Sequence, residues 1–492
     1  MKRLLVKPLA AAVLLALSGG AAQATDGDVA KELRRLAERL EALEKDNAAL
    51  RSQLAGESAV DKRLKVLEEN HARVEQGLAR ENLSETEPEL TSRLKAVEYQ
   101  SLEMQKQSRV IEALEGITAG ASFTTVAQRA SGGPNNEVQL NYRTDITAST
   151  PAGTIGDVTS KIFGHFRIGQ GKGLGNLMTA FSGANTSAFQ LGTAEQADNS
   201  AVMLAQAWYQ ADIPLPLGGF KPRSKETLTV NFGKMDPFAF FDQNAGANDE
   251  TRQFLSSMFV HNALLDNPLA ANVGADAYGF SPGVRMSYLN EWSKPENFRL
   301  SLGVFGAGPG ANFSRSFTSP FVIAQAETKQ MFFGGLAGNY RVMVWRNGQA
   351  PTYVSGETRP HRGIGLNFDQ RVGDGVTLFG RYGRAWGERL AFDQTLSLGA
   401  EFNGSYWNRG GDSLGVALGL NKVSADFRND APTLDGFGYA AQGVENVVEV
   451  YYRYRLNKQF EITPDFQWLR RPAGNGEASS VKILGARAQL VF

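Results

Sequence analysis

The stretch that decides the fold is residues 446–456, NVVEVYYRYRL, because apolar or aromatic residues occupy every second position in it. Side chains of a β-strand point alternately to its two faces, so this pattern predicts a strand with two unlike faces. One face carries Val448, Val450, Tyr452, Tyr454 and Leu456. The other carries Glu449, Tyr451, Arg453 and Arg455. An apolar face opposite a charged one is typical of a strand that lies between lipid and a watery lumen.

The same alternation recurs along the chain after residue 120. Residues 228–232 and 364–371 both alternate apolar with polar side chains. We count about seventeen strand-like segments, of which residues 177–181 form a weak one, and bacterial single-chain barrels have even strand numbers, so we expect about sixteen strands. A soluble β-sandwich or solenoid is the alternative, but ionisable side chains fill the face that it would have to bury.

The closing segment, residues 480–492, alternates as well. It places Arg487 and Gln489 on one face and ends on Phe492, which belongs to the apolar face. A terminal aromatic residue on the lipid side resembles the assembly signal of outer-membrane barrels. We therefore predict an all-β transmembrane barrel of antiparallel strands over residues 117–492, wide enough to leave an aqueous channel.

The composition excludes several functions. Basic and acidic side chains balance at 51 each, which argues against a nucleic-acid partner. There is no cysteine, so thiol redox chemistry and thiolate metal sites are ruled out. The four histidines have no metal-ligand spacing, and we find no hydrolase or nucleotide-binding motif in a fitting context. We expect neither an enzyme nor a cofactor.

The first 24 residues are expected to be a signal peptide. A basic start with Lys2, Arg3 and Lys7 precedes an apolar stretch, and Ala22-Gln23-Ala24 fits a cleavage site. The apolar stretch is short for a spanning helix, and no later run of about 18 apolar residues follows it. The mature chain is therefore expected to be exported and to cross a membrane only with strands, if it crosses one.

Residues 25–116 predict a periplasmic coiled-coil region. Leucines recur in steps of four and three from residue 33 to residue 54, with Asn47 in the one polar place of the seam. A buried amide at such a position fixes the register and the number of helices in the coiled coil, at a cost in stability. After Gly56 the seam resumes out of phase, and a weaker pattern continues to Gly116. A helix with one apolar stripe needs partner helices, so we expect an oligomer.

Five segments carry a resemblance to a known family. They read GKMDPFAFFD at 233–242, NDETRQFL at 248–255, GIGLNFDQ at 363–370, LFGRYG at 378–383 and PDFQ at 464–467. In this order they resemble the carbohydrate-selective porins of the OprB type. The resemblance implies a sixteen-stranded diffusion channel for sugars, usually a homotrimer, in the outer membrane. The added coiled coil departs from the compact members of that family.

The long excursion of residues 237–279 is the candidate substrate site, because loops far beyond about fifteen residues are usually functional or disordered. Its phenylalanines favour a structured loop folded into or over the pore. Aromatic faces suit the C–H surfaces of sugars, and polar groups suit their hydroxyls; packing of the rings against the wall, with solvated charges, is the alternative. The candidate residues in and beside this loop are Asp236, Phe240, Phe241, Asp242, Asn244, Asp249, Glu250 and Arg252, and those on the lumen wall are Arg381, Glu449 and Arg453. We assign Trp345, Trp386, Trp407 and Trp468 to the interfacial girdles.

The function expected first is facilitated diffusion of carbohydrates, with sugars as permeants and outer-membrane lipid around the barrel. Weak binding at a constriction allows both entry and exit. Two alternatives stay open: a general or anion-preferring porin, because lumen faces carry arginines, and a structural trimeric tether whose coiled coil could contact the cell wall.

Overall fold

The structure is a computed structural model, and it describes residues 116–131, 138–176, 179–190, 202–218, 224–267, 269, 279–373 and 375–492. Before residue 116 it describes only Lys45, Val66, residues 68–70 and Ala72, which are helical. The signal peptide and the coiled-coil seam therefore lie outside the described residues. The chain divides into two units, residues 1–111 and 112–492, and the second is the barrel.

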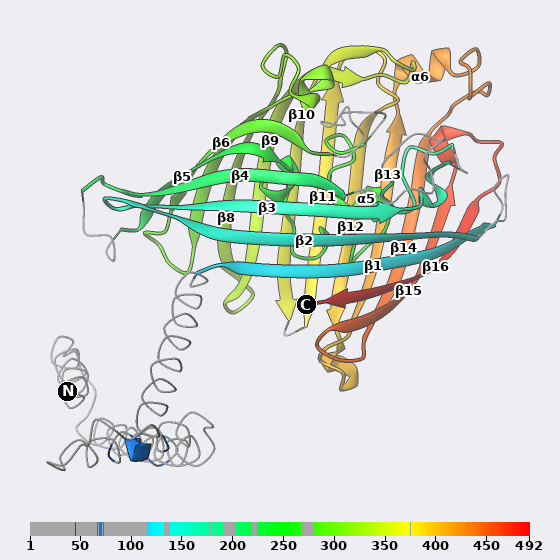
Figure 1. Ribbon diagram of the computed structural model, residues 1–492. Helices are drawn as coiled ribbons and strands as arrows, with labels where there is room; N and C mark the ends of the chain where they lie inside the picture. Colours follow the sequence, from blue (N-terminus) through cyan, green and yellow to red (C-terminus); the bar gives the residue numbers. More distant parts are fainter. Residues whose placement is uncertain are drawn as a thin grey trace, which may run out of the picture. The chain divides into compact units, whose positions relative to one another are not determined.

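Sixteen antiparallel strands close into a barrel, each paired with its neighbours along the chain (Figure 1). The strands are β1 (Thr118–Ser131), β2 (Val138–Ile155), β3 (Val158–Gln170), β4 (Val202–Leu215), β5 (Glu226–Met235), β6 (Ser281–Asn290), β7 (Asn297–Phe305), β8 (Phe321–Phe332), β9 (Leu336–Pro351), β10 (Thr358–Gly373), β11 (Val376–Trp386), β12 (Phe392–Asn403), β13 (Ser413–Val423), β14 (Val444–Arg455), β15 (Phe460–Arg470) and β16 (Val481–Val491). The helical turns are η1 (Gly173–Asn176), η4 (Pro237–Ala239), α5 (Ser257–Val260), η5 (Gly308–Asn312), η6 (Gly404–Trp407), α6 (Ala425–Asp430) and η7 (Pro472–Gly474). The predicted barrel and strand number are confirmed. No helix in the described part of the chain is long and apolar enough to cross a membrane.

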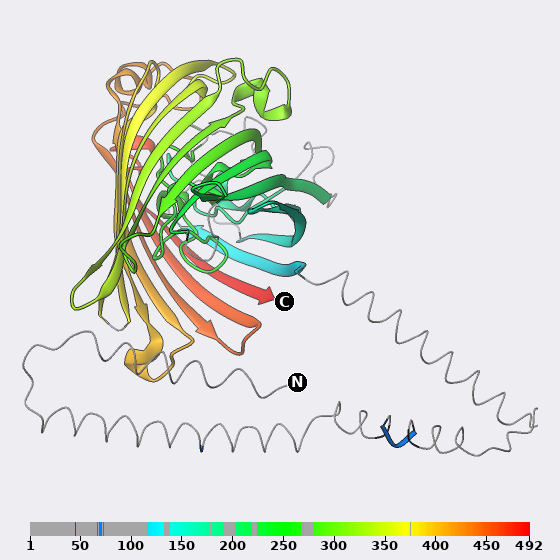
Figure 2. The same cartoon turned by 90° about the vertical axis from the view of Figure 1, so that its left-hand side faces the viewer.

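The first and last strands close the wall. β1 pairs with β16 in a register that sets Phe123 opposite Leu490. The final residue continues this pairing, since the Phe492 N–H donates to the Ala121 carbonyl at 2.8 Å. Figure 2 shows the C-terminus beside the start of β1, and we call this end of the barrel the terminal rim and the opposite end the loop rim.

The two faces of the wall follow the predicted alternation. On β14, Glu449 and Tyr451 are buried on the inside, whereas Tyr454 is exposed on the outside. On β10, Asn367 is buried and its neighbour Leu366 is exposed. The outer face is apolar because lipid replaces water there, and the inner face is polar because the lumen is wet.

The predicted weak strand at residues 177–181 is absent from its described part, residues 179–181. These residues belong instead to the connection between β3 and β4, which we call the β3–β4 loop (residues 171–201). The barrel therefore has sixteen strands, the even number expected of a closed single chain.

Candidate functional site

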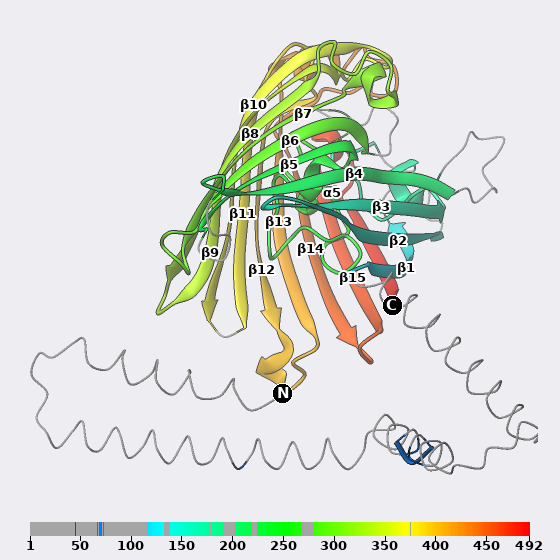
Figure 3. The same ribbon diagram turned by 60° about the vertical axis from the view of Figure 1, so that its left-hand side comes forward.

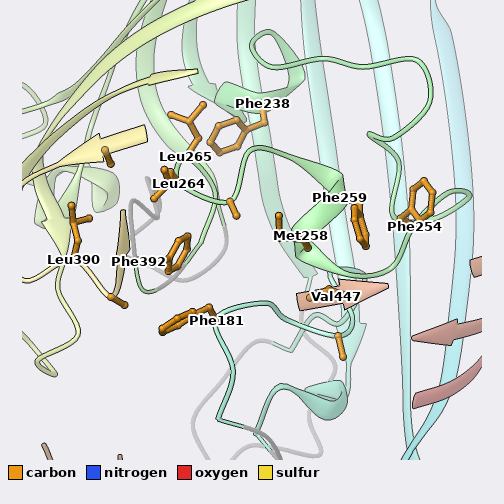
Figure 4. Packing of buried hydrophobic residues seen from close by; sticks show 14 of the residues in the cluster. Phe181, Phe238, Phe254, Met258, Phe259, Leu264, Leu265, Leu390, Phe392 and Val447 are labelled. Carbon is orange, nitrogen blue, oxygen red and sulfur yellow. The ribbon is translucent and has the colours of Figure 1, made fainter. Parts of the chain in front are cut away.

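The interior of the barrel is partly filled by the connection between β5 and β6, residues 236–280, which we call the β5–β6 loop. Phe254, Phe259 and Leu265 of this loop are fully buried inside the wall. Figure 3 shows α5 of the same loop within the outline of the barrel, and Figure 4 shows its apolar side chains packed together. Burial of a large side chain is worth about 1.5–3 kcal/mol, so these residues hold the loop inside. The predicted structured inner loop is confirmed for its described residues, which are 236–267, 269, 279 and 280.

Asp242 fixes the first turn of the loop. The residue is fully buried and has a positive φ of 55°. Its carboxylate accepts hydrogen bonds from the Asn262 N–H at 2.6 Å and from the Asn367 side-chain amide at 2.6 Å. Its own N–H donates to the side chain of Gln325 on β8 at 2.9 Å. Asp242 therefore joins two parts of the loop to two strands of the wall.

Arg381 on β11 holds three carbonyl groups of the loop. Its Nη1 donates to the Phe259 carbonyl at 2.6 Å, and its Nη2 donates to the carbonyls of Ala247 at 2.7 Å and Asp242 at 3.0 Å. Its Nε lies 3.1 Å from an Asp242 carboxylate oxygen. Since the guanidinium is fully buried and occupied by the loop, it is placed to position the loop rather than to meet a permeant.

Two further wall residues hold the far part of the loop. Glu449 on β14 accepts from the Leu255 N–H at 2.5 Å and the Ser256 N–H at 3.0 Å. Arg487 on β16 donates to the carbonyls of Glu250 at 2.9 Å and Gln253 at 2.7 Å. Hydrogen bonds to charged groups contribute about 1.5–3 kcal/mol each. The sequence places Arg487 on the lumen face but gives no sign of this loop contact.

The polar segment of the loop lies along β2, β15 and β16. Glu250 is paired with Arg143 at 2.7 Å, and Asp249 accepts from the N–H and hydroxyl of Thr251 at 2.9 and 2.6 Å. Arg252 keeps 37% of its side chain exposed while it pairs with Glu461. The predicted wall residue Arg453 lies near the same acid, 3.9 Å from Glu461, and is also 3.9 Å from Glu401.

The other predicted loop residues divide between packing and exposure. Phe241 is fully buried, and Asn244 donates to the Asn367 side chain at 2.8 Å and to the Phe368 carbonyl at 2.9 Å. Asp236 and Phe240 are half-buried and each lines a cavity. The structure thus brings the predicted residues into one region but commits several of them to internal contacts.

The described part of the β3–β4 loop, residues 171–176 and 179–190, is a second inner segment, and the sequence does not predict it. Glu445 on β14 accepts from the Phe181 N–H at 2.8 Å and the Ser182 N–H at 2.9 Å. The two inner loops also bind each other through their backbones, where Thr186 donates to the Leu255 carbonyl at 2.8 Å and Ser257 donates to the Gly183 carbonyl at 2.9 Å. The β3–β4 loop is 31 residues long, and so long a connection is usually functional. This length is the feature of the sequence that could have indicated a functional loop.

A cavity of about 700 Å³ lies between the two inner loops. Aromatic rings of Phe181, Phe189, Phe238 and Phe280 line it together with the polar side chains of Arg167, Asp236, Gln243, Asn248, Glu250, His261 and Asp266. The Arg167 guanidinium lies between two of the rings, 5.5 Å from Phe189 and 5.2 Å from Phe280. Its Nε bonds to Asp145 at 2.6 Å, which fixes its position.

One corner of this cavity combines a histidine with two acids. His261 stacks on Phe238 at 4.8 Å and bonds through Nδ1 to Asp266 at 2.8 Å. Burial by itself lowers the pKa of His261, but the hydrogen bond to Asp266 and the charges of Asp266 and Asp236 outweigh burial, so the pKa lies above its ordinary value of 6.5. Burial raises the pKa of Asp236. The corner therefore has both donors and acceptors for a neutral polar solute.

A second cavity of about 490 Å³ shares Ala239 and Gln243 with the first. Phe240 lines it, with its ring 4.9 Å from the Arg285 guanidinium and 5.6 Å from the Trp208 ring. Arg299, Arg341, Asp212 and Glu327 complete its charged lining. No sequence motif marks Arg285, Arg299 and Arg341, although each occupies a lumen-side position of an alternating strand.

One assigned girdle residue is corrected. Trp345 is 4% exposed and lies on the inner side of β9, in the same alternation as the buried Met343 and Asn347. Val342 and Val344 alternate with these buried residues and are exposed on the outer side of the strand. Trp386, in contrast, is 43% exposed on the outer face of β11, as predicted for a girdle. No group of metal-ligating side chains occurs within the residues that the structure describes.

The closed sixteen-stranded wall and its inward-folded loops define a porin, a barrel whose lumen is narrowed from within. The family model described as "Carbohydrate-selective porin, OprB family" matches residues 141–492, and the chain belongs to this family. The predicted family is therefore confirmed for the barrel, while the coiled coil lies outside the match.

The chain is also similar to solved and curated proteins. OprB of Pseudomonas putida in its high-pH structure has a TM-score of 0.62 at 16% identity, over 78% of this chain and 96% of that chain, which supports the fold. Porin AaxA of Chlamydia pneumoniae is 24% identical over 274 residues, 54% of this chain and 55% of the relative. Porin AaxA of Chlamydia abortus is 24% identical over 270 residues, 53% of each chain. The chain spans about half the length of the curated relatives it matches.

Proposed function

We propose that this barrel lets small carbohydrates diffuse across the outer membrane through a lumen narrowed by the β3–β4 and β5–β6 loops. The observation that carries the proposal is the cavity of about 700 Å³ between these loops, where phenylalanine rings face fixed polar groups. Rings suit the C–H faces of a sugar, and carboxylates, amides and Arg167 suit its hydroxyls. Contacts of this kind are weak enough for release, which conduction requires.

The predicted residues take two different roles in this proposal. Asp236, Phe240, Glu250 and Arg252 are the ones placed to meet a permeant, because they line a cavity or keep part of the side chain exposed. Arg453 and Asp249 shape the charge beside them. Phe241, Asp242, Asn244, Arg381 and Glu449 would act through the position of the loop.

A general or anion-preferring porin is the second candidate, and the arginines of the lumen favour it. Carboxylates already pair with several of them: Arg143 with Asp145 at 2.7 Å, Arg341 with Asp369 at 2.7 Å and Arg252 with Glu461 at 2.6 Å. Pairing lowers the net field that an anion meets. Arg285 donates to the neutral side chains of Asn231 and Ser301 instead, so its charge is the one that most favours an anion.

We further propose that the terminal rim faces the periplasm, so that residues 25–116 form a coiled coil there and hold three barrels together. The support is the leucine seam with Asn47. Sedimentation of a fragment spanning residues 30–80 tests this: a trimer supports the proposal, and a helical monomer at micromolar concentration contradicts it. Contact of this rod with the cell wall, in a structural tether, is a separate proposal that pull-down with peptidoglycan tests.

Swelling of liposomes that contain the purified full-length protein tests the transport function. Monosaccharides should enter faster than uncharged solutes of equal size that lack a sugar ring. Equal rates for both solutes would favour a general porin, and no swelling at all would favour a closed structural barrel.

A further inference from the structure

Three arginines cluster on the outer, lipid-facing wall at the loop rim. Arg346 on β9, Arg362 on β10 and Arg384 on β11 are all exposed. Arg346 and Arg362 are direct partners across the two strands, and Arg384 is the partner of Ile364, two residues further along β10. Their side chains therefore stand together on one face of three adjacent strands, outside the channel.

This arrangement places like charges next to each other without an acidic partner. Directly opposed like charges destabilise a pair of strands, since their Cβ atoms are about 4.5–5.5 Å apart. Within the part of the chain that the structure describes, none of the three arginines forms an ion pair with Asp or Glu. An anion bound from outside would remove the repulsion and use the free donors.

A groove of about 430 Å³ opens between these residues. Arg346 and Arg362 line it together with Arg359, Trp386 and Glu388. The one acid of the groove, Glu388, lies 3.9 Å from Arg359 and forms no ion pair with Arg346 or Arg362 among the described residues. The Arg384 guanidinium lies 5.4 Å from the centre of the Trp386 ring, so it borders the same place.

The wall immediately below the arginines is apolar. Val344 is 51% exposed and Leu366 is 46% exposed, each within four residues of an arginine on its own strand. Further toward the terminal rim, an apolar groove of about 500 Å³ on the outer wall is lined by Phe298, Leu300, Val342 and Leu366. At about 3.4 Å per residue, Leu366 lies roughly 14 Å from Arg362, which is within the reach of an acyl chain.

We propose that this patch binds a phosphorylated membrane lipid, with its phosphates on Arg346, Arg362 and Arg384 and its acyl chains along the apolar wall. Arginine forks match phosphate oxygens, and the apolar wall beneath matches hydrocarbon. An anion free in solution would not need the apolar wall beneath the arginines. The inference rests on the outer-membrane orientation proposed above, in which the loop rim meets the outer leaflet, where the lipid is a phosphorylated glycolipid.

Binding of lipid A to the purified full-length protein in detergent tests this. The test variant is R346Q/R362Q/R384Q, and the control is R129Q/K422Q/R470Q. The control removes the same charge from the same rim, because Arg129, Lys422 and Arg470 are exposed on the outer faces of β1, β13 and β15, which do not touch one another. Lipid A, its dephosphorylated form and inorganic phosphate serve as the three probes.

The test variant should bind lipid A at least about tenfold more weakly than the wild type, and the control should bind as the wild type does. Dephosphorylated lipid and inorganic phosphate alone should bind the wild type poorly. Equal losses in both variants would overturn the proposal in favour of general surface charge, and tight binding of inorganic phosphate would overturn it in favour of a free-anion site. Unchanged conductance of the test variant separates this result from the transport function.

Discussion

Arg252 of the β5–β6 loop and Glu461 of the barrel wall form a two-pronged ion pair, with Nη2 to Oε1 at 2.6 Å and Nε to Oε2 at 3.0 Å. Glu461 is buried, whereas Arg252 keeps 37% of its side chain exposed. The pair therefore holds the Arg252 guanidinium in place while part of this side chain stays exposed to the lumen. The arginine predicted as a sugar ligand is also a link between loop and wall.

Replacing Arg252 with Ala should weaken block of the channel by sugar about tenfold or more, because a hydrogen bond to a charged group contributes about 1.5–3 kcal/mol. Concentration-dependent block of single-channel current measures this. Arg252→Lys keeps the charge but loses the two-pronged geometry, so it should give an intermediate value. If both variants are blocked as strongly as the wild type, Arg252 does not touch the permeant.

Two phenylalanines of the same loop should respond differently to truncation. Phe259 is fully buried, so Phe259→Ala should cost about 3–5 kcal/mol and lower the temperature at which the barrel unfolds in detergent. Phe240 is half-buried at a cavity, so Phe240→Ala should lower the unfolding temperature less than Phe259→Ala does, and it should weaken sugar block. If Phe240→Ala instead lowers the unfolding temperature more and leaves sugar block unchanged, Phe240 is a packing residue.

Removing a wall anchor should loosen the loop without opening the barrel. Arg381→Met leaves three loop carbonyls and Asp242 without their partner, which costs about 1–3 kcal/mol for each buried group. We expect noisier open-channel current and faster proteolysis within residues 237–267, with the wall intact. Arg428→Met, a change at an exposed arginine of α6, is the control and should show neither effect.

The His261 and Asp266 pair should make stability depend on pH. The pKa of His261 is raised above its ordinary value of 6.5 in the folded protein, so the stabilisation is fully present below that value. It is lost as the pH rises through the folded pKa. Thermal unfolding at about pH 5.5 and about pH 8.5 should therefore differ more in the wild type than in His261→Gln. An equal difference in both proteins would assign the pH dependence to other groups.

Deletion of Phe492 should impair assembly more than transport. The residue is 70% exposed on the lipid side, and its backbone completes the closure between β16 and the start of β1. We expect less folded barrel in the outer membrane, but normal conductance in the molecules that do assemble. Normal surface levels of the truncated protein would contradict this.

The barrel could be predicted from sequence because its wall obeys one local rule. Each strand alternates between lipid and lumen, as Leu366 and Asn367 do, and this alternation is visible residue by residue. The β3–β4 loop could not be predicted in the same way, because its only alternating stretch, residues 177–181, is short and resembles a weak strand. Its position depends on contacts with Glu445, which lies about 260 residues further along the chain.

The candidate site was predictable as a region but not in its detail. The length and aromatic content of residues 237–279 located the inner loop. The alternation of the strands also predicted that Arg381 and Glu449 face the lumen. Their partners are backbone groups of the β5–β6 loop, which no side-chain pattern reveals. Arg167 and His261 were missed as lining residues because the cavity they share exists only where two loops meet.

Single-channel current at increasing concentrations of a monosaccharide tests most directly whether the inner loops form the constriction where sugars bind. The purified full-length protein is compared with a variant in which residues 244–252 are replaced by a short Gly-Ser linker. We expect saturable sugar block in the wild type, and larger conductance with no block in the variant. A folded variant with the wild-type conductance and the wild-type sugar affinity would contradict the claim that the inner loops form the constriction where sugars bind.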